Sequence, residues 1–138
     1  MTQQYSCSID SLPELLIRPL VEAALREDIR SGDITTEALI PSGLKGRATL
    51  NLRENGVVSG LDVARLAFTI LDPEANVRFH CLDGDSCTAG STLMEVEGSA
   101  RAILTGERGA LNCLQLLSGV ATATRKYVDV IAGTRAAR

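Results

Sequence analysis

Hydrophobic and polar positions follow a helical period near the start of the chain. Residues 1–18 show no such period and are expected to form a leader. From Pro19 onward, Leu20, Val21, Ala24 and Leu25 form an apolar stripe at helical spacing. The sequence Ser31-Gly32-Asp33 is expected to end this helix, with Asp33 capping a following turn. The pattern therefore predicts one amphipathic helix before residue 33.

The middle of the chain changes to the period of a β-strand. Residues 48–53 alternate, Asn55-Gly56 is a strong hairpin-turn signal, and residues 57–60 are expected to return as the paired strand. Helical spacing comes back over residues 61–72 and ends at Asp72-Pro73. Two further strands are expected at 77–82 and 92–96, with turns at 83–85 and 89–90 between them.

The last third of the chain is helical in pattern. Residues 100–132 predict two helices, separated at Ser118-Gly119. Strands followed by long helices favour an α+β fold, in which the final helices open a further unit.

Composition and charge exclude several classes of protein. The chain has 138 residues, is 45% hydrophobic, and carries a formal charge of −3. An acidic chain with few aromatic residues lacks the basic surface and stacking platforms of a nucleic-acid-binding protein. It contains neither a signal-peptide pattern nor an uninterrupted apolar run of about 18 residues. A cytoplasmic protein that binds no membrane is therefore expected.

The cysteines and the single histidine give no metal-site pattern. The four cysteines, at positions 7, 81, 87 and 113, form no CxxC pair and are expected to be reduced and structural. His80 stands between Phe79 and Cys81 in a strand-like run, so it is expected to be half-buried and hydrogen-bonded. Asp83-Gly84-Asp85 lacks the regular oxygen series of a calcium loop and is expected to be a turn.

The candidate chemistry lies on the helix over residues 101–117. On a helical wheel, five polar residues fall within an arc of about 80°. They are Arg101, Thr105, Arg108, Asn112 and Gln115. The remaining positions are almost all apolar or small, which predicts a mostly buried helix with one narrow polar stripe.

Arg108 is the main candidate residue on this stripe, and two interpretations stay open. Its planar guanidinium is suited to binding a carboxylate or phosphate of a substrate. The second interpretation is a solvated or subunit-facing arginine paired with an acidic neighbour, because structural ion pairs are common. Glu107 falls on the apolar side of the wheel, where an unpaired charge would be costly. We expect Glu107 to be a structural partner and not a general base.

Four segments together resemble quinolinate phosphoribosyltransferase, also called nicotinate-nucleotide pyrophosphorylase (carboxylating). They are ALREDIRSGDITTEALIP (24–41), RENGVVSGLDVA (53–64), LDGDSCTAGSTLMEVEG (82–98) and ILTGERGALNCLQLLSGVATATRKYVD (103–129). The resemblance implies an N-terminal α/β sandwich domain over residues 19–117. It also implies that residues 118–138 begin an α/β barrel whose remainder is absent from this chain.

The resemblance also implies an activity. The family transfers phosphoribosyl from phosphoribosyl pyrophosphate to quinolinate with Mg²⁺, giving nicotinate mononucleotide, CO2 and pyrophosphate. Arg108 matches the arginine of the family's E-R-x-x-L-N element, which contacts quinolinate in the neighbouring subunit's site. A homodimer or higher homo-oligomer is therefore expected.

The same resemblance implies that this chain alone is inactive. No catalytic residue and no Mg²⁺ ligand of the family falls on it, and the remaining basic and acidic site residues are expected beyond Arg138. Two alternatives stay open: a molybdenum-associated transport protein of the same fold, and a dimerisation module without a site.

Overall fold

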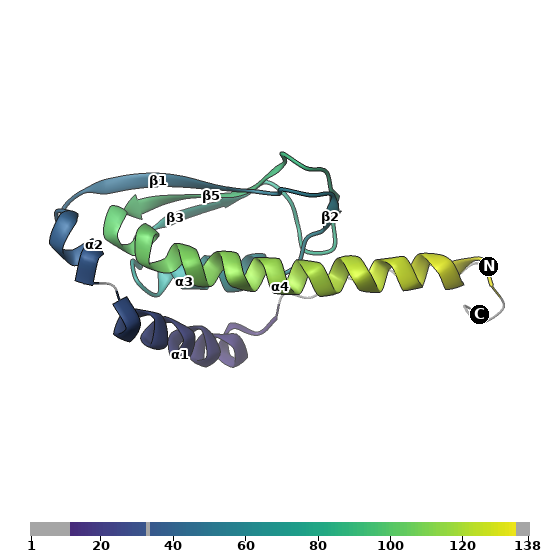
Figure 1. Cartoon of the computed structure of the whole chain (residues 1–138), viewed down its shortest axis with the longest axis horizontal. Coiled ribbons are helices and arrows are strands. Elements are labelled where there is room, and N and C mark those ends of the chain that lie inside the picture. The colour runs from purple at the N-terminus through teal and green to yellow at the C-terminus, as the bar shows by residue number, and fades with distance from the viewer. Residues whose placement is uncertain (1–11, 33, 135–138) are drawn as a thin grey trace.

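The computed structural model describes residues 12–32 and 34–134, which form three layers (Figure 1). The elements, in chain order, are α1 (Glu14–Gly32), α2 (Ile34–Leu39), β1 (Lys45–Asn51), β2 (Gly56–Val57), α3 (Leu61–Thr69), β3 (Asn76–Phe79), β4 (Ser86–Cys87), β5 (Thr92–Ser99) and α4 (Ala100–Ala132). Figure 1 shows a sheet on one side, α3 and α4 beneath it, and α1 on the far side of these two helices. The expected α+β fold is confirmed.

The main sheet is antiparallel, with strand order β1-β5-β3. Its inner face carries Leu50, Met94 and Val96, all buried, with Leu50 opposite Met94 in the register. Its outer face carries charged residues, among them Arg47 and Glu95, which form an ion pair at 2.8 Å. This alternation is typical of an antiparallel sheet that covers a core on one side only.

Helices α3 and α4 pack against the inner face and against each other. Leu66 and Phe68 of α3 are almost fully buried between the layers. Gly106 of α4 lies so close to α3 that an added Cβ would stand 2.9 Å from the carbonyl oxygen of Ala67. Helix α1 completes the core from the other side through Val21 and Leu25. Within the described residues, no helix is long and apolar enough to cross a membrane.

Helix α1 begins earlier than its apolar stripe predicts. It starts at Glu14 and contains Pro19 within its length, so assigning residues 14–18 to a leader was wrong. The Glu14 carboxylate accepts hydrogen bonds from Arg18 of its own helix and from Arg65 of α3, at 3.0 and 3.3 Å. Tertiary contacts of this kind outweigh the helix-breaking tendency of a proline. Residues 1–11 and the expected cap Asp33 lie outside the described residues.

The hairpin expected at Asn55-Gly56 does not form. Strand β1 pairs with β5, and the short strand β2 pairs with β4. The Asn55 side chain instead accepts a hydrogen bond from the backbone N–H of Ala89, at 2.9 Å. Pairing β1 with the distant β5 brings Leu50 against Met94, and this burial outweighs the local turn preference.

The break expected at Ser118-Gly119 is also wrong, because α4 continues through it as one helix of 33 residues. The Ser118 hydroxyl donates to the carbonyl oxygen of Ser59 at 3.1 Å and accepts from the Ser59 N–H at 3.0 Å. One turn later, Thr122 Oγ1 accepts from the Val57 N–H at 2.9 Å. These bonds hold the helix against the 57–59 segment and offset the weak helix propensity of Gly119.

Candidate functional site

Arg108 projects from the side of α4 that faces away from the core. The helix is anchored by Ala102, Gly106, Ala110 and Leu114, which are buried. Arg108 lies about 180° around the helix from the centre of this group and is exposed. Its guanidinium has no hydrogen bond or ion pair with any residue in the described ranges. The interpretation of Arg108 as half of an ion pair within its own chain therefore finds no support.

One residue of the polar stripe is hydrogen-bonded to another part of the chain, whereas others are exposed. Arg101 donates from Nε to the carbonyl oxygen of Ile40 at 2.6 Å and from Nη2 to that of Glu37 at 3.0 Å. It therefore satisfies carbonyl groups at the end of α2 and is not available to a ligand. Asn112 and Gln115, by contrast, are exposed on the same side as Arg108. The structure thus keeps Arg108, Asn112 and Gln115 together and removes Arg101 from the candidate set.

The expectation of a mostly buried helix was wrong. Glu107 is exposed, so no buried charge needs a partner there. Leu104 and Leu111 are also 47% and 42% exposed, although both are apolar. The reason is that the rest of the fold covers only the side of α4 that carries Gly106 and Ala110. Arg108 therefore stands beside two uncovered leucines on an open surface.

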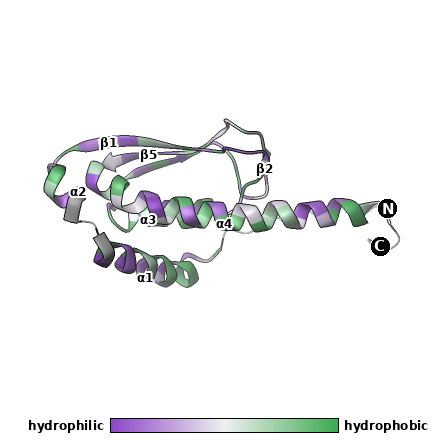
Figure 2. Ribbon diagram, in the orientation of Figure 1, coloured by the Kyte–Doolittle hydropathy of each residue, from purple (hydrophilic) through white to green (hydrophobic). Residues whose placement is uncertain are grey.

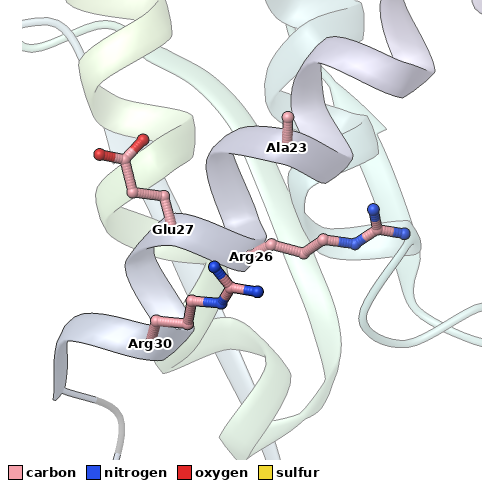
Figure 3. Close-up of a pocket in the computed structure, with 4 residues that line it drawn as sticks. All are labelled: Ala23, Arg26, Glu27 and Arg30. Carbon is pink, nitrogen blue, oxygen red and sulfur yellow. The ribbon is translucent and has the colours of Figure 1, made fainter.

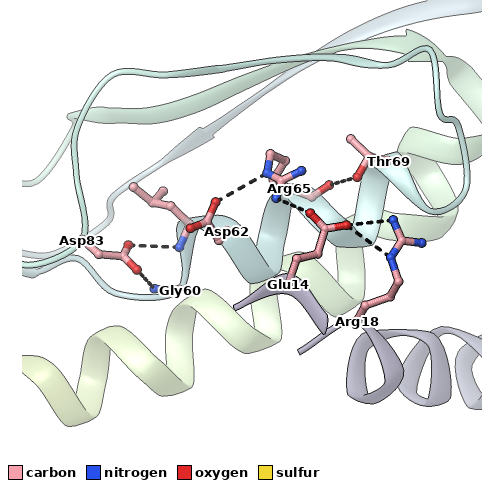
Figure 4. Close-up of polar contacts among 8 residues, drawn as sticks. Glu14, Arg18, Gly60, Asp62, Arg65, Thr69 and Asp83 are labelled. Atoms are coloured by element: carbon pink, nitrogen blue, oxygen red, sulfur yellow. Dashed lines mark hydrogen bonds and ion pairs between the residues drawn. The ribbon is translucent and has the colours of Figure 1, made fainter. Parts of the chain in front are cut away.

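The other polar candidates have structural roles. The Asp83 carboxylate accepts hydrogen bonds from the backbone N–H groups of Gly60 and Leu61, at 3.0 and 3.1 Å (Figure 4). It caps the first turn of α3, a role that the sequence analysis missed although the Asp-Gly-Asp turn carries the needed carboxylate. His80 is exposed, and its Nε2 lies 3.6 Å from the Glu95 carboxylate, beyond hydrogen-bond distance, so the expectation of a half-buried and hydrogen-bonded histidine was wrong.

No metal site is present among residues 12–32 and 34–134, where no three acidic, histidine or cysteine side chains converge. Cys81, Cys87 and Cys113 are free thiols, whereas Cys7 lies outside the described residues. An open depression of about 600 Å³ lies along α1 (Figure 3). It is lined by Ala23, Arg26, Glu27 and Arg30, all on one helix, and no second described element closes it.

The chain was compared with known proteins. Residues 33–118 match the model of the quinolinate phosphoribosyl transferase N-terminal domain. The chain is 40% identical over 122 residues to a probable nicotinate-nucleotide pyrophosphorylase (carboxylating) of Synechocystis, and 39% identical over 125 residues to the same enzyme of Mycobacterium leprae. These matches cover 87% and 86% of this chain but only 40% and 43% of the relatives.

Solved structures agree with the sequence matches. The crystal structure of NadC from Streptococcus pyogenes superposes with a TM-score of 0.86 at 38% identity. The nicotinate-nucleotide pyrophosphorylase of Francisella tularensis gives a TM-score of 0.81 at 34% identity. Each match covers 91% of this chain and 45% of the other, so the chain spans less than half the length of its relatives. The matched family model and the shared fold show that the chain belongs to the quinolinate phosphoribosyltransferase family, of which it carries the N-terminal domain.

Proposed function

We propose that this chain supplies Arg108 to a quinolinate-binding site that a second subunit completes. The full reaction would transfer phosphoribosyl from phosphoribosyl pyrophosphate to quinolinate, giving nicotinate mononucleotide, CO2 and pyrophosphate. The relatives carry the names of this enzyme, which favours it over a molybdenum-associated protein of the same fold. The observation that carries the proposal is the exposed guanidinium of Arg108, which has no partner among the residues that the structure describes, on a firmly anchored helix.

The surroundings of Arg108 favour an anionic ligand. Leu104 and Leu111 form an apolar surface beside it, and such a surface gains free energy when another protein covers it. Covering these leucines would also remove water from Arg108. A desolvated guanidinium is strongly unfavourable unless a negative charge replaces the water. A substrate carboxylate would supply that charge, because its two oxygens match the fork of guanidinium N–H groups.

Arg108 would act by binding and orienting the substrate. Quinolinate carries two carboxylates on adjacent ring carbons, and a bidentate contact to one of them would fix the orientation of the ring. After the ring nitrogen has been joined to ribose, the cationic ring would stabilise the electron pair left on the ring carbon as CO2 leaves, and that carbon would then take up a proton. Asn112 and Gln115, exposed on the same side of α4, would add neutral donors to this site.

Mg²⁺ is expected with phosphoribosyl pyrophosphate, but the described residues do not fit a site for it. Hard divalent cations need several oxygen ligands at one point, and no such cluster occurs between residues 12 and 134 where the structure describes the chain. We therefore propose that phosphate oxygens and protein groups outside this chain would bind the ion.

The role of Arg108 can be tested on the chain joined to the C-terminal part of the Streptococcus pyogenes relative. Arg108→Ala should lower kcat/KM for quinolinate about 100-fold, which corresponds to about 3 kcal/mol for hydrogen bonds to a charged group. Arg108→Lys should recover only part of the loss, because an ammonium group lacks the planar fork. Nicotinate mononucleotide formation, followed by chromatography, provides the measurement.

Arg125→Ala is the matched control, because Arg125 is also exposed on α4 and has no partner among the described residues. If both alanine variants kept the same kcat/KM, Arg108 would have no place in the site. If Arg108→Ala weakened self-association alone, the dimerisation-module interpretation would replace the proposal.

The contribution across subunits has its own test. Arg108→Ala protomers are mixed with protomers inactivated by a substitution in the C-terminal part. In each mixed dimer, one of the two sites would then be intact. Because an equal mixture also contains inactive unmixed dimers, its activity should return to roughly a quarter of that of the unmutated protein. Continued inactivity of a mixture that forms mixed dimers would show that Arg108 acts within its own subunit or not at all.

A further inference from the structure

Asn55 and Gly56 form the only Asn-Gly pair of the chain, and the structure does not use them as a hairpin turn. Asn55 is exposed in the connection after β1, and Gly56 begins the two-residue strand β2 (Figure 1). The Asn55 Oδ1 accepts the hydrogen bond from the Ala89 N–H at 2.9 Å. The Nδ2 group of the same amide has no partner among the residues that the structure describes.

This pair carries a reactive combination of groups. The main-chain nitrogen that follows an asparagine can attack the side-chain amide carbon, because bonding of these two atoms closes an unstrained five-membered ring. Glycine in the following position favours the attack, since it has no side chain to obstruct it and adopts the required backbone angles freely. The other three asparagines, at positions 51, 76 and 112, are each followed by a residue with a side chain.

The surroundings of Asn55 assist the attack. As the Gly56 nitrogen bonds to Cγ, negative charge develops on Oδ1, and the Ala89 N–H at 2.9 Å is placed to stabilise that charge. The Nδ2 group is free to take up a proton and leave as ammonia. Pairing of Gly56 with Cys87 restrains the nitrogen, but β2 and β4 pair over two residues only, so local opening releases it.

We propose that Asn55-Gly56 is a site of spontaneous modification, at which Asn55 is converted into isoaspartate with water as the co-reactant. The Gly56 nitrogen forms a bond to Asn55 Cγ and gives up its proton, the Cγ–Nδ2 bond breaks, and ammonia leaves. Water then opens the resulting succinimide ring at the main-chain carbonyl, which leaves a free carboxylate and a main chain that runs through Cγ. The net reaction consumes one water molecule and releases one ammonia, without oxidation or reduction.

The modification would loosen the middle of α4. Isoaspartate lengthens the main chain directly before β2 by one carbon–carbon bond, about 1.5 Å. The residues that follow are bound to α4 at short distances, from the Val57 N–H to Thr122 Oγ1 at 2.9 Å and from the Ser59 N–H to Ser118 Oγ at 3.0 Å. Gly56 has no spare room either, because an added Cβ would stand 2.8 Å from Thr122 Oγ1. A displaced main chain would therefore lose these bonds.

The test follows the full chain in a buffer of about pH 8.5, where base promotes removal of the Gly56 proton. Cleavage with trypsin after Arg53 and Arg65 gives the peptide 54–65, in which Asn55 is the only asparagine. We expect this peptide to become heavier by about 1 Da, because a carboxylic acid replaces the amide. The rate should increase about tenfold for each pH unit. The product should accept a methyl group from protein isoaspartate methyltransferase, which identifies isoaspartate.

Two asparagines of the same sample are internal controls. Asn76 in β3 and Asn112 in α4 should remain unconverted over the time in which Asn55 reacts. The variant Asn55→Gln is the matched control, because the longer side chain cannot close the five-membered ring, and it should keep both its mass and its melting temperature.

Ala89→Pro tests the assistance from the Ala89 N–H. Ala89 is the second residue of a turn that the Ser91 N–H closes on the Thr88 carbonyl oxygen at 3.1 Å, and Gly90 follows it with φ 89°. Proline is favoured at the second position of such a turn, so the variant removes the donor and keeps the turn. Conversion of Asn55 should slow by at least about tenfold. The melting temperature of the fresh variant shows that the fold is retained.

The unmutated protein, once converted, should melt about 5 °C below the fresh protein, because the bonds to Thr122 and Ser118 are lost. Three results would overturn the proposal: Asn55 converts no faster than Asn76, or Ala89→Pro leaves its rate unchanged or raises it, or the converted protein melts like the fresh one. Because the assay follows mass and melting temperature, it is independent of the proposed enzymatic activity.

Discussion

At the junction of β5 and α4, the buried carboxylate of Asp72 accepts hydrogen bonds from two backbone N–H groups. These come from Ser99 at 2.7 Å and from Glu74 at 3.1 Å. The bond from Ser99 is the main reason that the pKa of Asp72 lies below its usual value, and the bond from Glu74 and the charge of Lys45 act in the same direction. A single side chain therefore ties the turn after α3 to the residue that caps α4.

Asp72→Asn should lower the free energy of unfolding by about 1–3 kcal/mol at pH 7, because hydrogen bonds to a charged acceptor are lost. A depressed folded-state pKa gives stability that is present above the unfolded pKa, near 4, and is lost as pH falls through the folded value. The difference between the two proteins should therefore shrink below about pH 4. Urea unfolding at a series of pH values from 7 to 2 measures this difference in the free energy of unfolding.

Asp129→Asn, at an exposed position of α4, is the control for removing a carboxylate, and it should leave stability unchanged. A stability difference between the unmutated protein and Asp72→Asn that stayed constant down to pH 2 would contradict this account.

The sequence predicted the surroundings of some single residues better than those of others. The wheel placed Arg108 on the polar stripe of the helix, and the structure has this residue exposed, since its position depends on helical geometry. It misplaced Glu107, because a wheel does not show which part of an apolar surface a neighbouring layer covers.

Helix packing depends on a close crossing of α3 and α4. Gly106 and Gly109 stand one turn apart on α4 but meet different surroundings. An added Cβ at Gly106 would lie 2.9 Å from the carbonyl oxygen of Ala67 and 3.1 Å from the ring of Phe68. At Gly109 the nearest atom, an oxygen of Asp28, would be at 3.7 Å, an ordinary contact distance.

These two glycines give opposite predictions for the same substitution. Gly106→Ala should lower the free energy of unfolding by about 1–3 kcal/mol, since the backbone of α3 would have to move. Gly109→Ala should raise it by up to about 1 kcal/mol, because alanine favours the helix and no atom obstructs its methyl group. Chemical denaturation of both variants provides the measurement, and equal changes of the same sign would contradict the close crossing.

At the level of elements, the sequence predicted whether a segment is a helix or a strand better than it predicted which strands pair. The strand at 92–96 and the helix at 61–72 are present as β5 and α3, because their periodicity reflects one buried face. Strand pairing was missed at Asn55-Gly56, since pairing between distant segments leaves little local signal. The continuity of α4 was missed because the hydroxyl contacts of Ser118 and Thr122 come from residues far away in sequence.

Over the described part of the molecule, buried residues are concentrated in the three layers, and exposure increases toward the end of α4. Beyond Thr122, every residue to Thr134 is exposed, and Figure 2 shows apolar and polar residues alternating along this end of the helix. Val130 is 74% exposed and Tyr127 is 76% exposed. A helical end without tertiary contacts is marginally stable in water.

Amide hydrogen exchange should show this difference within one helix. In the isolated chain, amides of residues 124–132 should exchange at least about 100-fold faster than those of residues 104–114, which belong to the packed half. Mass spectrometry of peptic fragments measures both. Comparable protection of the two segments would mean that the exposed end has a partner in solution, such as a second copy of the chain.

Gly106 also determines the rotation of α4 about its own axis. The helix can lie this close to Ala67 only where it presents a glycine, which has a hydrogen atom in place of a side chain. This requirement fixes the rotation of the whole helix about its axis. Arg108 is two residues further on, about 200° around the axis, so its direction follows from that rotation. If α4 were rotated about its axis by the angle between successive residues, about 100°, the guanidinium would move toward the core. Gly106 thus sets the direction of Arg108, the arginine on which the proposed chemistry depends.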